Sequence, residues 1–217
     1  MHYSPSNTLL TTFAPLLPVD STGIIAHQAP DFFALWEALE CEVGEVCEVP
    51  YWAAIWPGAR LLARYLLDRP ETVAGKSVLE FGAGGAVASI AAMRCGATNA
   101  TANDIDAVGL LIAAKNSARN NVSLLFNNHN LLASDESTVS DVVLVADMFY
   151  ERSTADALYQ FLCRQRDRGS QVFVSDGGRA FTPKAAMTPL ISGRFTVNQP
   201  LEGRPERTAT LYRLDAP

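Results

Sequence analysis

Two acidic residues and a glycine-rich turn have the types and spacing needed to bind a small ligand. The turn runs from Gly82 to Ala86 and carries almost no side chain, so a ligand can approach its backbone closely. Glu80 stands two residues before Gly82 in the pattern Glu-x-Gly-x-Gly, which ends at Gly84, and Asp104 follows Glu80 by 24 residues. An acidic residue at that distance is typical of a nucleotide site, where it accepts hydrogen bonds from a ribose.

The residues of the turn favour one class of nucleotide over another. A dinucleotide fingerprint needs a third glycine where this chain has Val87. S-adenosylmethionine carries a cationic amino group and a sulfonium but no phosphate, so a carboxylate that points into the turn suits it and would repel a pyrophosphate. We therefore expect S-adenosylmethionine beside Glu80, Gly82 and Gly84, with Asp104 on its ribose. A nicotinamide dinucleotide and a turn that binds nothing are the alternatives.

A second candidate segment runs from Asp147 to Glu151, directly after an apolar run. Ligands of open α/β sheets bind beyond the carboxyl ends of the strands, so Asp147 is expected to face the cofactor across the crevice. Phe149 and Tyr150 are expected to wall the slot for a methyl acceptor, and Glu151 is grouped with them on the acceptor side. The alternative is an ordinary helix start that Asp147 or Ser153 caps.

Two further residues are candidates for contact with the cofactor. Trp52 and Trp56 fall just ahead of the first core strand. Tryptophans in such a place are usually core packing, and a wall over the adenine or the reacting methyl is the alternative for both of them. Asn130 belongs to the polar turn at residues 127–132, where an adenine edge could be read.

The elements that must position these residues alternate between strand and helix. Apolar runs separated by amphipathic stretches predict an α/β fold, a Rossmann-like, mostly parallel, doubly wound sheet of seven strands that ends in an antiparallel hairpin. We expect strands at 77–81, 98–103, 123–126, 139–146, 170–175, 195–198 and 207–214. We expect helices at 31–42, 86–94, 108–120, 154–168, 181–190 and from Pro57 up to Pro70. In the helix at 154–168, the residues expected to face inward are Ala157, Leu158, Phe161 and Leu162.

The chain before the glycine turn differs from the rest. Residues 1–29 show no helical periodicity and are expected to form an extended arm, and residues 46–50 a short extended piece. We predict an N-terminal extension at residues 1–50, packed on a single methyltransferase domain at residues 51–217.

Composition excludes several classes of protein. The chain has 217 residues, of which 48% are hydrophobic and 18% charged, and no run of about 18 apolar residues predicts a membrane span. Before Arg60 there are seven acidic residues and no lysine or arginine, which disfavours a nucleic-acid partner and a cleavable targeting segment, so we expect a cytoplasmic protein. This acidic stretch would attract a basic protein surface, or it is only a solvated face. Scattered histidines and four cysteines without a C-x-x-C pair predict no metal site.

Several blocks of the sequence resemble a known family. PYWAAIWPGARLLARYLLDRPETVAGKSVLEFGAGG, ANDID, VVLVADMFYER, SDGGRAF and RTATLYRL together resemble the electron transfer flavoprotein β-subunit lysine methyltransferases. These are seven-β-strand protein lysine methyltransferases with a D-x-x-Y element, here Asp147 to Tyr150. The resemblance covers roughly residues 30–214. The chain departs from the family at Ala86, where the family often has glycine. It also departs at residues 175–179, where this chain has SDGGR and the relatives have GDPGR.

The resemblance implies roles for the candidate residues. It implies S-adenosylmethionine as donor and a protein lysine as acceptor, that of the electron transfer flavoprotein β subunit. Glu80, Gly82 and Gly84 would form the methionine-end loop, Asp104 the ribose contact, Trp56 a cofactor-side wall and Asp147 the acceptor-side carboxylate. A small-molecule N-methyltransferase on the same fold and a non-catalytic donor-binding module are the alternatives, since fold does not fix the acceptor.

The chemistry of methyl transfer to an amine assigns opposing effects to these groups. Asp147 would stabilise the positive charge that arrives at nitrogen, but it also favours the protonated lysine, whose pKa is about 10.4. An aromatic slot of Phe149, Tyr150 and Trp56 would lower that pKa by desolvation. The same rings would hold a methylated ammonium by cation–π contact, worth about 0.5–2 kcal/mol.

Overall fold

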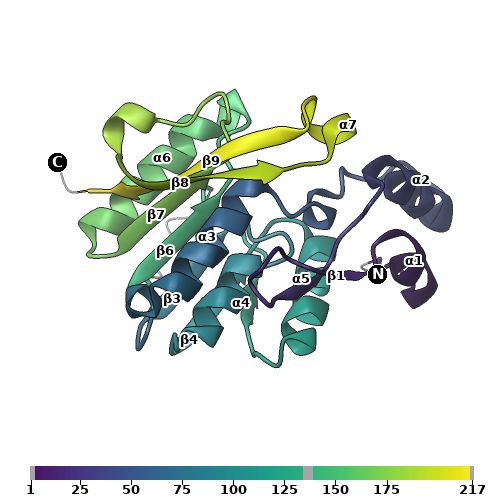
Figure 1. Cartoon of the computed structure of the whole chain (residues 1–217), viewed down its shortest axis with the longest axis horizontal. Coiled ribbons are helices and arrows are strands. Elements are labelled where there is room, and N and C mark those ends of the chain that lie inside the picture. The colour runs from purple at the N-terminus through teal and green to yellow at the C-terminus, as the bar shows by residue number, and fades with distance from the viewer. Residues whose placement is uncertain (1–2, 134–138, 216–217) are drawn as a thin grey trace.

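A seven-stranded sheet forms the centre of the molecule (Figure 1). The computed structural model describes residues 3–133 and 139–215. The strand order is β5-β4-β3-β6-β7-β9-β8; the first five strands run parallel, and β9 pairs antiparallel with β7 and β8. The strands are β3 (Ser77–Phe81), β4 (Asn99–Asn103), β5 (Leu125–Asn127), β6 (Val142–Ala146), β7 (Gln171–Asp176), β8 (Thr188–Thr196) and β9 (Glu206–Leu214). The predicted mostly parallel sheet with a terminal antiparallel hairpin is confirmed.

The order of the strands reverses at β3, and this reversal positions the site. From β3 the chain moves outward to β4 and β5, and then returns to place β6 and β7 on the other side of β3. In register, Phe81 lies between Asn103 and Val145, so β3, β4 and β6 end at the same edge of the sheet. The glycine turn, Asp104 and Asp147 follow directly, which brings the predicted segments together at the switch point.

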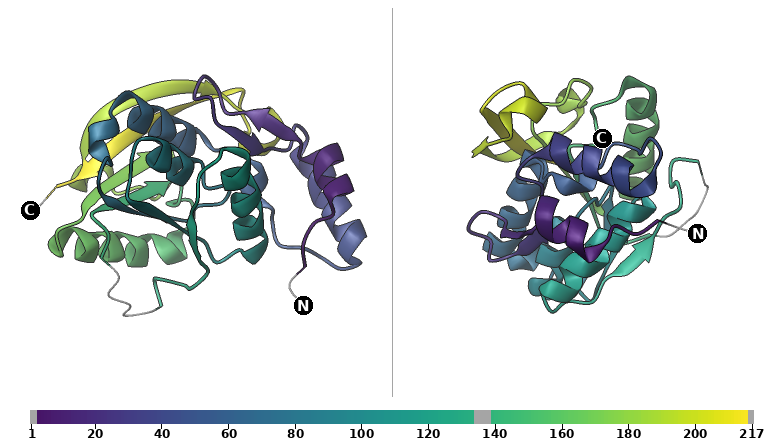
Figure 2. Two further views of the ribbon diagram at one scale, coloured as in Figure 1. Left: turned by 90° about the horizontal axis from the view of Figure 1, so that it is seen from below. Right: turned by 90° about the vertical axis from the view of Figure 1, so that its right-hand side faces the viewer.

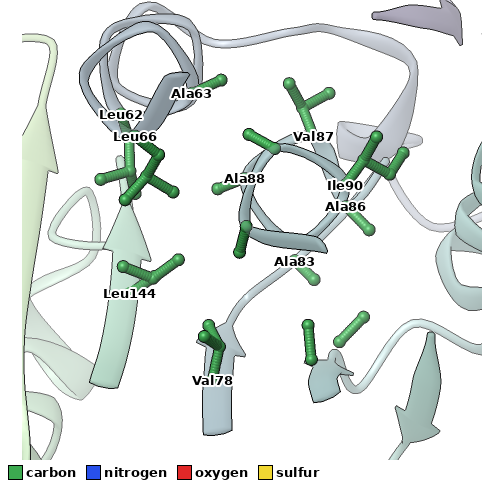
Figure 3. Packing of buried hydrophobic residues seen from close by; sticks show 14 of the residues in the cluster. Leu62, Ala63, Leu66, Val78, Ala83, Ala86, Val87, Ala88, Ile90 and Leu144 are labelled. Carbon is green, nitrogen blue, oxygen red and sulfur yellow. The ribbon is translucent and has the colours of Figure 1, made fainter. Parts of the chain in front are cut away.

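Helices cover both faces of the sheet because its strands bury apolar side chains on both. On one face α3 (Pro57–Asp68), α4 (Val87–Arg94) and α5 (Ala107–Arg119) pack on Val78 and Leu144, and Figure 3 shows Leu62 and Leu66 of α3 beside the alanine-rich α4. On the other face α6 (Arg152–Asp167) packs on the neighbouring residues Leu79 and Val143. Side chains alternate between faces along a strand, so continuous apolar runs are the expected pattern here.

The N-terminal segment is more regular than predicted, because the expected extended arm at residues 1–29 contains a helix and a hairpin. Helix α1 (Asn7–Phe13) begins where the Ser6 hydroxyl accepts a hydrogen bond from the Leu9 amide, and it buries Leu9 and Leu10. Strands β1 (Leu16–Pro18) and β2 (Ile25–His27) pair antiparallel. Helices α1 and α2 (Phe32–Val43) lie side by side at one end of the molecule (Figure 2). With two buried positions, α1 is too short to show a helical period.

Three other predictions about elements are wrong. Residues 181–190 form no α-helix; a single 3₁₀ turn, η3 (Lys184–Ala186), precedes β8, which has already begun at Thr188. Ala157 of α6 is exposed, and Ala155 packs inward in its place. The N-cap of α6 is Glu151 rather than Asp147 or Ser153, and its side chain makes no capping hydrogen bond. The remaining short turns are η1 (Tyr51–Ala53), η2 (Pro70–Thr72) and α7 (Gln199–Glu202).

Across residues 3–133 and 139–215, no helix is both long and apolar enough to cross a bilayer. In the same part of the chain, no three His, Cys, Asp or Glu side chains gather in an arrangement that could hold a metal ion. All four cysteines are free thiols.

Candidate active site

The glycine turn between β3 and α4 has the backbone conformation that its sequence predicts. Gly82 has φ 66° and Gly84 φ 47°, in the left-handed region that glycine adopts at no steric cost. Ala86 has φ 57° and adopts the same region at the cost that its Cβ brings. A Cβ at Gly82 would collide with the thioether of Met148, which packs directly on this residue. Glycine is therefore required at position 82 by both the backbone angle and the close approach of the segment after β6.

Glu80 lies behind the turn, although its sequence position suggests that it points into it. Its side chain is buried, and Oε2 accepts a hydrogen bond of 2.7 Å from the amide of Ser89 in the first turn of α4. Burial raises the pKa of Glu80 to about 7, more than the helix amides lower it. The carboxylate thus stabilises the start of α4, and direct contact with a ligand stays a prediction.

Asp104 fixes the glycine turn from the side of β4. Its Oδ2 accepts a hydrogen bond of 2.7 Å from the Gly84 amide, and Oδ1 accepts one of 3.0 Å from the Asp106 amide. The side chain is only partly buried, and this burial raises its pKa above the ordinary value for aspartate. A carboxylate therefore stands at the open edge of the turn, where the predicted ribose contact would have to be.

Asp147 is buried and binds to the protein itself. Its backbone has φ 56°, and its side chain is only 4% exposed. Oδ2 accepts a hydrogen bond of 2.6 Å from the Gly58 amide in the first turn of α3, and Oδ1 accepts one of 2.8 Å from the Gly177 amide. A Cβ at Gly58 or Gly177 would collide with this carboxylate. The prediction that Asp147 faces an incoming lysine is therefore disfavoured by its partners, which make it a link between α3 and the loop after β7.

Asp147 is the first member of a series of ion pairs that was not predicted from the sequence. The Arg179 Nε lies 3.1 Å from Asp147 Oδ1, and its Nη2 lies 3.0 Å from Glu202 Oε1. Glu202 is in turn 2.8 Å from Arg207 Nε. Burial raises the pKa of Asp147, while the charge of Arg179 and the Gly177 amide lower it. The SDGGR block was singled out for the resemblance and for its departure from the family, but its ion pairs were not predicted, because partners 23 and 32 residues from Arg179 leave no local signal.

The aromatic residues divide into buried and exposed groups. Phe149 is 1% exposed and packs in the core beside α6, which disfavours its predicted role as a wall of the acceptor slot. Trp52 is also a core residue. Tyr150 is 45% exposed, and its ring centroid lies 5.6 Å from that of Tyr51, which lies 6.1 Å from that of Trp56. Tyr51 was missed, although it stands in the PYWAAIWPG block.

Tyr150 connects this aromatic group to the glycine turn. Burial raises the pKa of the Tyr150 hydroxyl, and the neighbouring Tyr51, Glu151 and Asp104 raise it further. The hydroxyl therefore lies within electrostatic reach of the carboxylate that holds Gly84. The two segments singled out in the sequence, one after β4 and one after β6, lie at the same edge of the sheet.

The predicted adenine-reading turn lies at the end of β4. The Asn103 amide Nδ2 donates hydrogen bonds of 2.9 Å to the carbonyl oxygens of Asn127 and His129, and so holds residues 127–132 against this edge. Asn130 is exposed, and its Oδ1 accepts a hydrogen bond of 3.0 Å from the Leu132 amide. Its contact with a cofactor, like that of Trp56, stays a prediction. Asn103 had not been singled out.

A cavity of about 160 Å³ lies elsewhere, next to the start of α3. Its lining includes Phe32, Trp56, Arg60, Asn198, Leu201 and Glu202. No residue of the glycine turn lines it, and Trp56 is the residue that it shares with the aromatic group.

Comparison with known proteins places the chain among methyltransferases. Residues 63–153 match the family model for ribosomal protein L11 methyltransferase (PrmA). Among solved structures, the N-methyltransferase NodS from Bradyrhizobium japonicum is 15% identical with a TM-score of 0.53, over 74% of this chain and 98% of that one. TrmN from Thermus thermophilus is 16% identical with a TM-score of 0.54, over 72% of this chain and 49% of that one. At 15–16% identity, the likeness to these two structures establishes only the fold of this chain.

Several curated relatives are more similar and carry the same name. The electron transfer flavoprotein beta subunit lysine methyltransferase of Danio rerio is 41% identical over 133 residues, 60% of this chain and 51% of the relative. The human protein of that name is 41% identical over 135 residues, so the chain spans about half the length of these relatives. The Caenorhabditis elegans homolog is 32% identical over 165 residues, 69% of this chain and 68% of the relative. The chain therefore belongs to the electron transfer flavoprotein beta subunit lysine methyltransferase family.

Proposed function

We propose that this protein is an S-adenosylmethionine-dependent protein-lysine N-methyltransferase that acts on the electron transfer flavoprotein β subunit. The observation that carries the proposal is the sheet edge at the switch point, where the ends of β3, β4 and β6 are followed by a side-chain-poor turn, a half-buried carboxylate and the exposed Tyr150. Membership of the family supports the same activity. The acceptor is the one in the relatives' names.

The residues of the turn fit a cationic, phosphate-free donor. The turn itself carries little side chain, with Met148 packed on Gly82, and Asp104 presents a carboxylate at its edge. Within residues 3–133 and 139–215, neither Glu80 nor Asp104 has a lysine or arginine in an ion pair. A phosphate would have no cation beside it here, whereas a sulfonium and an ammonium would be stabilised. The raised pKa of both carboxyl groups shows that their negative charge is poorly compensated in the folded protein.

When bound, S-adenosylmethionine would supply an electrophilic methyl group. The lone pair of a neutral lysine nitrogen would form the new bond to the methyl carbon while the electrons of the carbon–sulfur bond pass to sulfur. The lysine first loses its proton to solvent. The protein then has two tasks: to align the nitrogen with the methyl group and to favour the neutral amine. Asp147 does not oppose this deprotonation, because its charge is compensated by Arg179 and it faces the start of α3. We assign Asp147 a positioning role, in which it fixes the segment that carries Tyr150.

A labelling experiment tests the proposal. Purified protein, S-adenosylmethionine with a labelled methyl group and recombinant electron transfer flavoprotein are incubated, and the label is located by mass spectrometry. We expect label on lysine of the β subunit, and its loss when Asp104→Ala is used or excess S-adenosylhomocysteine is added. Label found only on low-mass metabolites would instead identify a small-molecule N-methyltransferase. Donor binding without any labelled product would identify a donor-binding module.

A further inference from the structure

Tyr51 occupies a place at the crevice that the proposed function does not explain. Its ring lies between those of Tyr150 and Trp56, at centroid distances of 5.6 and 6.1 Å. Tyr51 is 46% exposed and Tyr150 is 45% exposed, whereas most aromatic residues around them are core residues. Two partly exposed rings in contact with each other are a feature that a merely structural role would have buried.

The backbone holds the Tyr51 ring in place independently of its own hydroxyl group. The Trp56 indole Nε1 donates a hydrogen bond of 3.0 Å to the carbonyl oxygen of Tyr51, and the Tyr51 amide donates one of 2.7 Å to the Val49 carbonyl. The ring therefore stands on a fixed segment just before α3. Substitution of its side chain leaves both of these hydrogen bonds available.

The neighbouring tryptophan is a poorer partner for an arriving cation. The guanidinium carbon of Arg179 lies 4.9 Å from the centroid of the Trp56 ring, so one face of this ring already contacts a cation. Arg179 is itself paired with Asp147 and Glu202, which holds it there. A second cation at Trp56 would meet the repulsion of the first. The rings that remain for an ammonium group are those of Tyr51 and Tyr150.

The charges around these two rings also suit a cation. Burial raises the pKa of the Tyr150 hydroxyl, and its neighbours Tyr51, Glu151 and Asp104 raise it further. Two of these neighbours are carboxylates. Glu151 is exposed, and in the described part of the chain it forms no ion pair. An aromatic face flanked by carboxylates attracts ammonium groups, including methylated ones.

We propose that Tyr51 and Tyr150 together seat the ammonium group of the acceptor lysine, with Tyr51 as a specificity-determining residue that contacts the methylated side chain. This inference rests on the proposed function, since it concerns the acceptor of that reaction. Trp56, which was predicted to form an aromatic slot with Phe149 and Tyr150, donates a hydrogen bond to the Tyr51 carbonyl and contacts Arg179.

Direct binding of the product side chain tests the proposal without turnover. The probe is Nα-acetyl-trimethyllysine methylamide, titrated by NMR into protein saturated with S-adenosylhomocysteine. Its uncharged isostere, in which a tert-butyl group replaces the trimethylammonium group, reports the contribution of charge. Tyr51→Ala removes the ring, Tyr51→Phe keeps it, and Phe33→Ala removes an aromatic side chain of similar exposure, 49%, from α2.

We expect Tyr51→Ala to weaken probe binding about fivefold, the range of one cation–π contact at a partly exposed site. Tyr51→Phe and Phe33→Ala should change it less than twofold, and the isostere should bind more weakly than the probe. Tyr51→Ala should also raise the acceptor KM while the Kd for S-adenosylhomocysteine stays within twofold. Equal probe binding by Tyr51→Ala and wild type, or no preference of the wild type for the probe over its isostere, would overturn the proposal.

The two proposals fail in different ways. If wild-type protein transfers no methyl group to any lysine but binds the probe through Tyr51, the proposed function is wrong and the cation seat stands. If lysine methylation is normal in Tyr51→Ala, with unchanged acceptor KM and probe binding, the function stands and the seat is wrong.

Discussion

Replacement of Gly58 with alanine should destabilise the protein strongly, because this glycine lies at the closest approach between α3 and the sheet. A Cβ at position 58 would lie 2.6 Å from the backbone oxygen of Ser175 and would overlap the Asp147 carboxylate. The Ser175 oxygen belongs to β7 and accepts the Asp147 amide, so it cannot move without disturbing the strand. The start of α3 must therefore shift outward.

The magnitude follows from what that shift disrupts. The Gly58 amide donates a 2.6 Å hydrogen bond to a buried carboxylate, and a hydrogen bond to a charged group contributes about 1.5–3 kcal/mol. Overpacking adds about 1–3 kcal/mol, and the better helix propensity of alanine returns about 1 kcal/mol. The free energy of unfolding should fall by about 2–4 kcal/mol. For a chain of 217 residues, this corresponds to a decrease in Tm of roughly 5–15 °C.

Gly109→Ala is the matched control, since Gly109 also stands in the first turn of a helix, α5, and is also buried. Its nearest neighbour would be Asp106 Oδ2 at 3.3 Å, a side chain that can move by a few tenths of an ångström. Urea denaturation of this variant should give a free energy of unfolding within about 1 kcal/mol of wild type. If Gly58→Ala is as stable as wild type, or less affected than Gly109→Ala, the account of α3 held against Asp147 is refuted.

Three further predictions concern the carboxylates. Because burial raises the pKa of Glu80 to about 7 from an ordinary 4.5, the folded state retains a proton that the unfolded chain has lost. Stability should therefore fall as pH rises from about 4.5 to 7, and Glu80→Gln should remove up to about 3 kcal/mol of that fall in urea titrations; an unchanged pH profile would contradict this. Asp147→Ala should lower the free energy of unfolding by about 3 kcal/mol. Adding Arg179→Met should recover at least about 1 kcal/mol of that loss in a double-mutant cycle, because the unpaired cation is removed as well. Strict additivity of the two changes would show that the pair is not coupled. Asp104→Ala should weaken S-adenosylhomocysteine about 10- to 100-fold in calorimetry, because it removes charge-assisted hydrogen bonds to the ribose; unchanged affinity would move the ribose contact elsewhere.

Local chemistry made the region around the glycine turn predictable. The apolar run at residues 77–81, the glycines after it and the alanines of α4 each favour the conformation that the structure shows. None of them depends on a distant partner. By contrast, residues 181–190 were predicted as a helix because their local sequence tolerates one. Pairing with β9 extends β8 back to Thr188, and such pairing across the chain overrides a weak local preference.

The acceptor side was less predictable, because one residue decides which way a side chain faces. Phe149 and Tyr150 are adjacent and similar in sequence terms, yet the first is buried beside α6 and the second is exposed at the crevice. Which of the two faces solvent depends on how the segment after β6 leaves the sheet. The left-handed backbone of Asp147 sets that direction, and its sequence gave no indication of it.

The sequence by itself determined the order of strands and helices from α2 to β7, the glycine turn and the identity of the two candidate segments, because these follow from short-range steric preference and apolar periodicity. Only the tertiary structure decided which carboxylates are open to a ligand and which hold the fold together. Asp104 and Asp147 look equivalent in the chain, each at the end of a parallel strand. Asp147 is buried among partners from 30 to 89 residues away, which are Gly58, Gly177 and Arg179, whereas Asp104 and Tyr150 remain partly exposed.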